Sequence, residues 1–313
     1  MNKFIVSATP HIKRNFNVFT QNLFMILALL PSIICSIIFF GLSAAIIVLV
    51  STAFCYLIDL MFSYLVLGKY DPKDLSSVVT GLVLGLCMPI GINLGYVVLA
   101  SFISIFVAKI IFGGQGKSII NESALGIALL AGLIAGFSSF LCAYAATDGT
   151  SIISPLEYFV KGDYTKIPLL SLFLGSGGGL IGTSSALAAI IGGIILSLTM
   201  VYDFYIPVFS IVSFVIVTII TKGATAFLPE LFAGSFLFVS CFMLPAHSSS
   251  PTTWLSKSLY SIIFGVIVAL TRMNYLMGEA GVFFCLILVN LLAPMLDAIC
   301  SHFFRGRRTR RYE

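Results

Sequence analysis

The sequence predicts an all-α integral membrane protein of about ten transmembrane helices, and three observations support this fold class. Hydrophobic residues make up 59% of the 313 residues and charged residues only 9%, whereas a soluble domain carries about 25% charged residues. The mean hydropathy of +1.11 is too high for a surface that faces water. About ten apolar runs approach the roughly 20 residues that a membrane-spanning helix needs. Lipid is therefore the solvent expected around most of the chain.

The expected spans follow one another along the chain with short polar connections between most of them. Positive residues near both ends of the chain favour an even number of spans, because lysine and arginine beside a span stay on the cytoplasmic side. We therefore expect a multi-pass protein of the cytoplasmic membrane with both termini in the cytoplasm. The spans are expected at residues 23–40, 44–67, 75–89, 94–112, 124–145, 185–201, 207–220, 231–245, 255–270 and 281–304.

The last residues, 305–313, form a basic tail that contains five arginines. A basic tail can bind nucleic acid, but directly after an apolar segment it is more typical of a topology signal or an anchor to acidic lipid. We therefore expect membrane lipid, and no nucleic acid, as a partner of this tail. The seven cysteines lie within or beside apolar runs and form no Cys-x-x-Cys pair. They are typical of small buried hydrophobic residues, so neither a disulfide nor a metal site is predicted.

An internal repeat can be read from the ends of two short spans. The third expected span ends in Cys-Met-Pro89 and the eighth in Cys-Phe-Met-Leu-Pro245. Glu122 follows Pro89 by 33 residues, and Glu279 follows Pro245 by 34. Two units of five spans must be inverted relative to each other because five is odd, and such repeats place a site where short helices end near the membrane midplane. The alternative interpretation is chance similarity among leucine-rich segments.

The repeat divides the chain into four parts. Residues 1–145 form an N-terminal five-helix repeat and residues 185–304 a C-terminal one. Residues 146–184 form an extracytoplasmic loop and a glycine-rich segment between them, and residues 305–313 are the cytoplasmic tail. The longest polar stretch of the chain, residues 147–166, then lies outside the cytoplasm.

Glu122 and Glu279 each open an apolar span. A carboxylate at a helix N-terminus is stabilised by roughly 0.3–1 kcal/mol, so both residues could be simple caps. Ionisable residues close to the membrane are costly and usually functional, so both are also candidates for an ion pathway. The pattern alone leaves the two interpretations open.

Residues 175–185 are rich in glycine and hydroxyl groups at the start of a span. Such a segment lets backbone amides approach an anion or a flat ring. The alternative is close helix packing through small residues, which is the commoner use of glycine in membranes.

Several stretches resemble the D subunit of Rnf-type electron-transport complexes, in the RnfD/NqrB family, in order and over nearly the whole chain. The resemblance implies a membrane subunit of an ion-translocating oxidoreductase that couples ferredoxin/NAD-type electron transfer to Na⁺ or H⁺ movement. It also implies other membrane and peripheral subunits and a flavin transferase as partners. The matching stretches are residues 7–13, 74–89, 109–121, 148–156, 182–188, 242–251 and 289–297.

The resemblance implies FMN joined through its phosphate to a hydroxyl in the extracytoplasmic loop, with a second flavin such as riboflavin as a further candidate cofactor. The family motif Asp-Gly-x-Ser-Gly-Ala-Thr corresponds here to residues 148–154, so the acceptor threonine has become Ser154 and the Gly-Ala pair has become Ile152-Ile153. Ser154 is therefore the candidate attachment residue. The other candidate flavin-binding residues are Asp148, Gly149, Ser151, Gly182, Ser184 and Ser185.

Departures from the family pattern leave an alternative open. The family has carboxylates at the positions of Thr183 and Ala246, and it lacks the one at Glu122. The alternative is a transporter-like or channel-like protein of the same fold that has lost the covalent flavin, and a further one is a subunit with a purely structural role.

Overall fold

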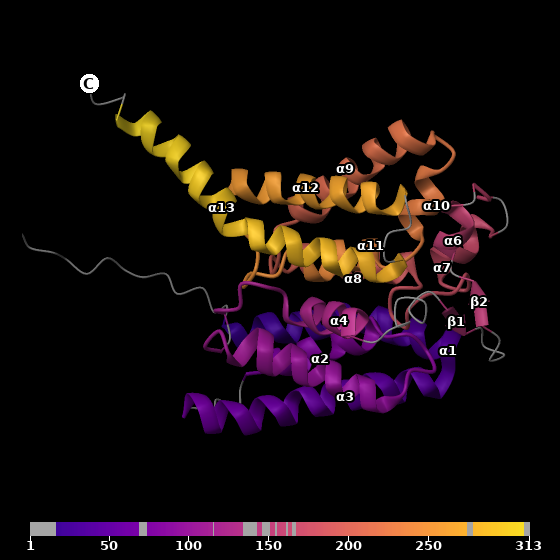
Figure 1. Ribbon diagram of the computed structural model, residues 1–313, viewed down its shortest axis with the longest axis horizontal. Coiled ribbons are helices and arrows are strands. Elements are labelled where there is room, and N and C mark those ends of the chain that lie inside the picture. The colour runs from indigo at the N-terminus through magenta and orange to yellow at the C-terminus, as the bar shows by residue number, and fades with distance from the viewer. Residues whose placement is uncertain are drawn as a thin grey trace, which may run out of the picture.

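Most of the described part of the chain is helical, with long helices that run roughly parallel to one another (Figure 1). The computed structural model describes residues 17–68, 74–114, 116–133, 143–145, 151–153, 155–160, 162–164, 167–273 and 278–309. The expected all-α fold class is confirmed for this part of the chain, apart from one two-stranded sheet of three residues per strand.

Four helical stretches are long and apolar enough to cross a membrane. They are residues 18–66, the helix α9 (Tyr205–Lys222), the helix α12 (Trp254–Met273) and residues 278–302, which combine η4 (Gly278–Ala280) with most of α13 (Gly281–Thr309). Many large apolar side chains on these helices are exposed, such as Ile38, Ile220 and Met295. Side chains of this kind need lipid around them, so the protein is a multi-pass membrane protein.

The first helix, α1 (Val18–Phe62), contains a sharp turn at Gly41. A straight helix of its 45 residues would be about 68 Å long, more than twice the roughly 30 Å of a bilayer core. Gly41 has φ 70° and ψ −156°, a backbone conformation that residues other than glycine rarely adopt. This residue falls between the first two expected spans, and a π-helical turn, η1 (Ser63–Leu67), continues the second arm.

The remaining apolar helices are shorter than a membrane span. An 11-residue helix such as α2 rises only about 16 Å, which is half of the bilayer core. These helices are α2 (Ser76–Leu86), α3 (Leu94–Phe102) with its π-helical continuation η2 (Ile103–Ile110), α4 (Glu122–Leu133) and α8 (Ala186–Leu198).

Two expected spans differ from the structure. The fifth was expected at 124–145, but α4 ends at Leu133 and residues 143–145 form the strand β1 (Ala143–Ala145). The eighth was expected as one span at 231–245. It consists instead of α10 (Phe227–Phe232), α11 (Phe236–Phe238) and the π-helical turn η3 (Val239–Met243), because Gly234 with φ 72° interrupts the helix.

A small cap covers one end of the helix bundle. In it, β1 pairs antiparallel with β2 (Ser151–Ile153), with Ala143 opposite Ile153. The cap also contains α6 (Pro155–Val160) and α7 (Leu169–Leu174). Figure 1 shows these elements at the right-hand end, whereas α13 ends on the left.

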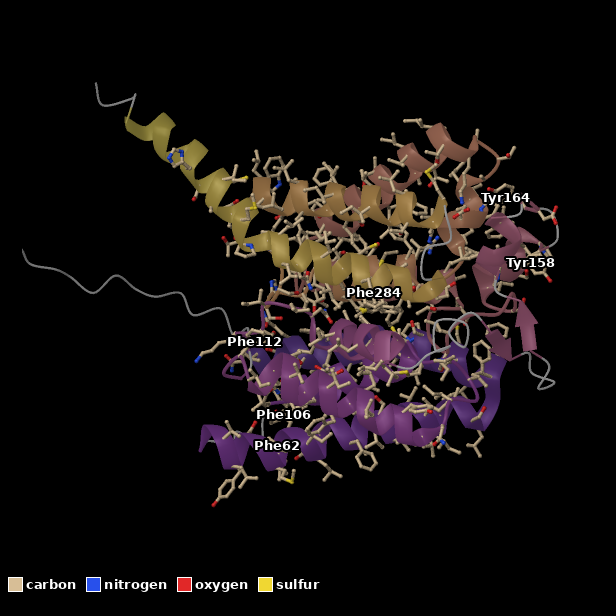
Figure 2. All side chains as sticks on the ribbon, viewed as in Figure 1. Phe62, Phe106, Phe112, Tyr158, Tyr164 and Phe284 are labelled. Atoms are coloured by element: carbon tan, nitrogen blue, oxygen red, sulfur yellow. The ribbon has the colours of Figure 1, made fainter. Side chains whose placement is uncertain are left out.

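Close packing through small residues holds each half of the bundle together. A Cβ atom on Gly81 or Gly85 of α2 would overlap the backbone of α1 at Thr52 or Val48. A Cβ on Gly265 of α12 would likewise overlap α9. Small residues of this kind let membrane helices approach closely. In Figure 2, the labelled Phe62 and Phe106 lie together at one edge of the first half, with ring centroids 4.8 Å apart.

Candidate functional site

A cavity of about 300 Å³ lies between the N-terminal helices and a wall formed by the end of η3 and the residues that follow it. The start of α1, one face of α2 and the start of α4 form one wall. Residues 242–248 and 201–202 form the other. The polar residues that line the cavity are Gln21, Asn22, Ser76, Thr80, Asn121, Glu122, Ser123, Tyr202, His247 and Ser248.

Glu122, a predicted ion-pathway residue, lines this cavity from the first turn of α4. The Thr80 hydroxyl donates a hydrogen bond to its Oε2 at 2.7 Å. The side chain that caps α4 is the neighbouring Asn121, whose Oδ1 accepts a hydrogen bond from the Ala124 amide at 3.3 Å. Asn121 also donates from Nδ2 to the Met243 carbonyl at 3.1 Å and so bridges the two walls. Asn121 thus supplies the capping hydrogen bond of α4, and Glu122 follows it in the first turn.

Behind the cavity, the buried Lys109 contacts charged and polar side chains of the first half. Its Nζ lies 2.8 Å from Oδ2 of Asp59 and 3.6 Å from Oδ2 of Asp74, and it donates to the Ser76 hydroxyl at 2.7 Å. Glu122 interacts electrostatically with the same ammonium group. Only 2% of the Lys109 side chain is exposed, so its charge depends on these partners. We call Asp59, Asp74, Lys109 and Glu122 the lysine network.

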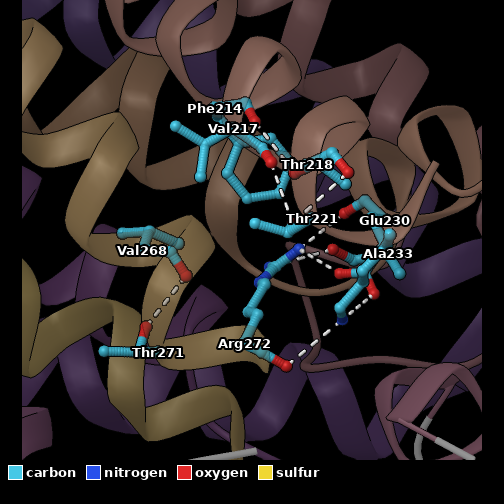
Figure 3. A network of polar contacts seen from close by, with 10 residues as sticks. Phe214, Val217, Thr218, Thr221, Glu230, Ala233, Val268, Thr271 and Arg272 are labelled. Atoms are coloured by element: carbon cyan, nitrogen blue, oxygen red, sulfur yellow. Dashed lines mark hydrogen bonds and ion pairs between the residues drawn. The ribbon is translucent and has the colours of Figure 1, made fainter. Parts of the chain in front are cut away.

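A second buried network joins the end of α9, α10 and the end of α12 (Figure 3). The Lys222 Nζ lies 2.5 Å from Oε1 of Glu230. Arg272 donates to the carbonyls of Glu230 at 2.5 Å and Ala233 at 3.1 Å. The Arg272 guanidinium also lies over the Phe214 ring, 5.3 Å from its centroid, an arrangement that stabilises a desolvated cation.

Glu279, the other predicted ion-pathway residue, belongs to this second network. It is fully buried, and its Oε2 accepts hydrogen bonds from the Ser235 amide at 3.0 Å and the Ser235 hydroxyl at 3.3 Å. A Cβ atom on Gly234 would lie 2.6 Å from Oε2 of Glu279 and 3.0 Å from Nη2 of Arg272. The carboxylate and the guanidinium therefore both pack directly on this glycine. We call Lys222, Glu230, Arg272 and Glu279 the arginine network.

Sequence reasoning selected the two glutamates but missed their partners. Lys109, Asp59, Glu230 and Arg272 each lie within or beside an apolar segment, where ionisable residues are rare and costly. That rarity is the signal that could have identified them.

The structure describes only some of the predicted flavin residues. Asp148, Gly149 and Ser154 lie outside the described residues, and Ser151 lies in β2 opposite Ala145. The remaining three, Gly182, Ser184 and Ser185, lie between α7 and α8.

Gly182 and Ser185 have structural roles that explain them. The Gly182 amide donates to the Leu86 carbonyl at 2.6 Å, and a Cβ at this position would overlap the Leu86 side chain. Ser185 caps α8 by accepting from the Ala188 amide at 3.2 Å. The Ser184 hydroxyl is buried and has no hydrogen-bond partner among the described residues. Close packing thus accounts for the glycine at position 182.

Comparison with known proteins identifies the family. A family model described as NQR2, RnfD, RnfE matches residues 5–304. The chain belongs to the NQR2, RnfD, RnfE family. The expected resemblance is thereby confirmed over nearly the whole chain.

Relatives within the family fall into two kinds of complex. The D subunit of the Na⁺-translocating ferredoxin:NAD⁺ oxidoreductase complex of Acetobacterium woodii is 28% identical over 93% of this chain and 92% of its own. The D subunit of the proton-translocating ferredoxin:NAD⁺ oxidoreductase complex of Clostridium ljungdahlii is 25% identical over 95% and 94%. The B subunit of the Na⁺-translocating NADH-quinone reductase of Azotobacter vinelandii is 28% identical over 70% of this chain and 58% of its own.

Proposed function

We propose that this chain is the D-type membrane subunit of an ion-translocating oxidoreductase complex. The complex would couple ferredoxin/NAD-type electron transfer, through bound flavin, to the movement of Na⁺ or H⁺ across the membrane. The observation that carries the proposal is that two D subunits match this chain over more than nine tenths of both lengths. The chain then works with other membrane and peripheral subunits and is not catalytic alone.

The proposal includes ten spans in two inverted repeats, with both termini in the cytoplasm. Support comes from the positions of the two networks along the chain, which correspond between the two proposed repeats. Lys109 and Arg272 lie near the ends of the fourth and ninth expected spans, and Glu122 and Glu279 open the fifth and tenth. In the α11–η3 segment, Ser235 at its start contacts the arginine network, and Met243 at its end lines the cavity. An inverted repeat would place two such networks at opposite ends of the bundle.

The proposal also includes FMN, attached by a flavin transferase to Ser154. In its support, β2 ends at Ile153 and α6 begins at Pro155, and both elements lie in the cap at the end of the bundle opposite the end of α13 (Figure 1). A cap at the membrane surface is accessible to a transferase outside the cytoplasm. A second flavin, such as riboflavin, is part of the same hypothesis.

The experiment is to purify the chain with its native complex and to measure both flavin and electron transfer. We expect a fluorescent flavin band that survives denaturation and reduction of NAD⁺ by reduced ferredoxin in membranes. A complex without flavin in either the protein or its acid extract would reject the redox function.

The second candidate function is a transporter or channel of the same fold that lacks the covalent flavin. It is favoured by the polar lining of the cavity between the two halves and by the change of Gly-Ala to Ile152-Ile153. It predicts ion or solute flux through the isolated chain in liposomes. Absence of flux, together with flavin-dependent electron transfer, would reject it.

A further inference from the structure

The two buried networks differ in their balance of charge. In the arginine network, two cations, Lys222 and Arg272, accompany two carboxylates, Glu230 and Glu279. The charges cancel when every group is ionised. A buried network is stable when its charges are paired and hydrogen-bonded, so this one suits a permanent structural role.

The lysine network contains three carboxyl groups and a single cation. If Asp59, Asp74 and Glu122 were all ionised, two negative charges would remain uncompensated by Lys109 among the residues that the structure describes. Uncompensated charge away from water is costly, and a buried carboxyl group lowers that cost by taking up a proton. One carboxyl group of this network therefore has a physical reason to be protonated.

The contacts identify which carboxyl group this is. Asp59 and Asp74 lie 2.8 Å and 3.6 Å from the Lys109 ammonium. Glu122 interacts with the same ammonium group only at longer range, and its hydrogen bond comes from the neutral Thr80 hydroxyl. A carboxylate beside an ammonium group stays ionised more readily than one held by a hydroxyl. Glu122 is thus the member of the network that is best placed to bind the proton.

Glu122 also has a route to solution, because it lines the cavity. Val18, Gly116, His247 and Ser248 line the same cavity and are exposed, so the cavity opens at the protein surface. The charged groups that face Glu122 are Lys109 from η2, Asp59 from α1 and Asp74 before α2. The other titratable groups are Cys55 from α1, and Tyr202 and His247 across the cavity. Glu279, in contrast, is 0% exposed.

We propose that Glu122 is a proton-binding site that exchanges with solution through this cavity, and that Glu279 is a structural group. A hard metal cation needs several oxygen ligands at once, and the Lys109 ammonium, 2.7 Å from the cavity-lining Ser76 hydroxyl, repels one. A proton needs only the carboxylate oxygen. The role of this site in ion movement rests on the proposed function, but its protonation does not.

Labelling of the native complex with dicyclohexylcarbodiimide tests the proposal, since this apolar reagent modifies protonated carboxyl groups at membrane depth. Peptide mass spectrometry should find the label on Glu122 and leave Glu230 and Glu279 unmodified. Labelling should fall about tenfold for each pH unit once the carboxyl group deprotonates. Glu122→Gln should remove the label, while Asp297→Asn, a change at a partly exposed position that does not line the cavity, should leave it.

Three results would overturn the proposal: no label on Glu122 at any pH, labelling that ignores pH, or protection by Na⁺ at constant pH. The last would indicate a metal-cation site instead. The unmodified protein gives these answers even if Glu122→Gln fails to fold. Flavin content and electron transfer, measured on the same sample, test the proposed function, whereas the label tests only the proton site. A complex that reduces NAD⁺ but shows no label rejects only the proton site.

Discussion

Lys109 and Asp59 form a buried salt bridge of 2.8 Å between two helical segments that are 50 residues apart in the sequence. Ser63 donates a further hydrogen bond to the same aspartate at 3.1 Å. The pair fixes η2 against the second arm of α1, next to the segment that carries Glu122. The same salt bridge therefore holds two helices of the first half together and sets the charge near Glu122.

Replacing this lysine should destabilise the protein. Lys109→Met removes the only ammonium within the lysine network among the described residues, and it leaves Asp59 and Asp74 without their cation. Breaking a buried ion pair in this way costs about 3–5 kcal/mol, so the midpoint of thermal unfolding in detergent should fall clearly. Lys117→Met is the control, because Lys117 is exposed and should tolerate the change. Equal midpoints for the two variants would show that the salt bridge does not support the fold.

Gly234 tests the packing of the arginine network. An alanine there would place its Cβ within 3.0 Å of Glu279 and Arg272 and would also strain a backbone with φ 72°. Gly223 has φ 92° but nothing within 4 Å of its Cβ position. Gly223→Ala should therefore cost only the backbone strain, about 1–3 kcal/mol, and Gly234→Ala distinctly more. Similar losses in unfolding temperature would mean that the network shifts freely away from the glycine.

Asn121 tests the bridge across the cavity. Asn121→Ala removes both the cap of α4 and the hydrogen bond to the Met243 carbonyl. Asn93→Ala removes only a comparable cap, the bond from the Gly95 amide. Each lost cap costs about 1 kcal/mol, and the lost bridge should add about 1 kcal/mol. A larger loss of thermal stability in the Asn121 variant is the expected result, and equal losses would argue that the bridge contributes nothing.

The identity of residue 154 should decide covalent flavin attachment. Ser154→Ala removes the hydroxyl that a phosphoester needs, so the mass of one FMN should disappear from the intact chain. Ser154→Thr restores the residue of the family motif and should keep that mass. Ser151→Ala is the control for a nearby hydroxyl. If FMN persisted in Ser154→Ala, the attachment would have to lie at another residue.

The sequence was most informative where single residues carry strong physical signals. Ionisable residues beside apolar spans are rare, so Glu122 and Glu279 could be identified without a structure. The same rarity applies to their partners, but it could not show which residues pair, because Lys109 meets Asp59 across 50 residues and Arg272 meets Glu230 across 42. Hydropathy gives the positions of the spans along the chain, but it contains no information on which charged groups face one another.

Boundaries of the short elements were the least predictable. Residues 143–145 are apolar enough to extend the fifth expected span, yet they pair with 151–153 as a strand. The eighth expected span is uniformly apolar around Gly234, so hydropathy cannot reveal that the backbone turns there. Gly182 was compatible with a ligand site as well as with the commoner close packing, and the position of Leu86 shows that this glycine is closely packed.

Gly41 has a consequence for how the protein is made. A Cβ on this residue would meet nothing within 4 Å, so the glycine provides only its backbone conformation. During synthesis, the 45 residues of α1 leave the ribosome as one apolar stretch, and the insertion machinery must release them into the bilayer as a hairpin of two arms. A substitution at Gly41 should therefore disturb biogenesis, and the amount of protein that reaches the membrane, before it disturbs any contact of the mature fold.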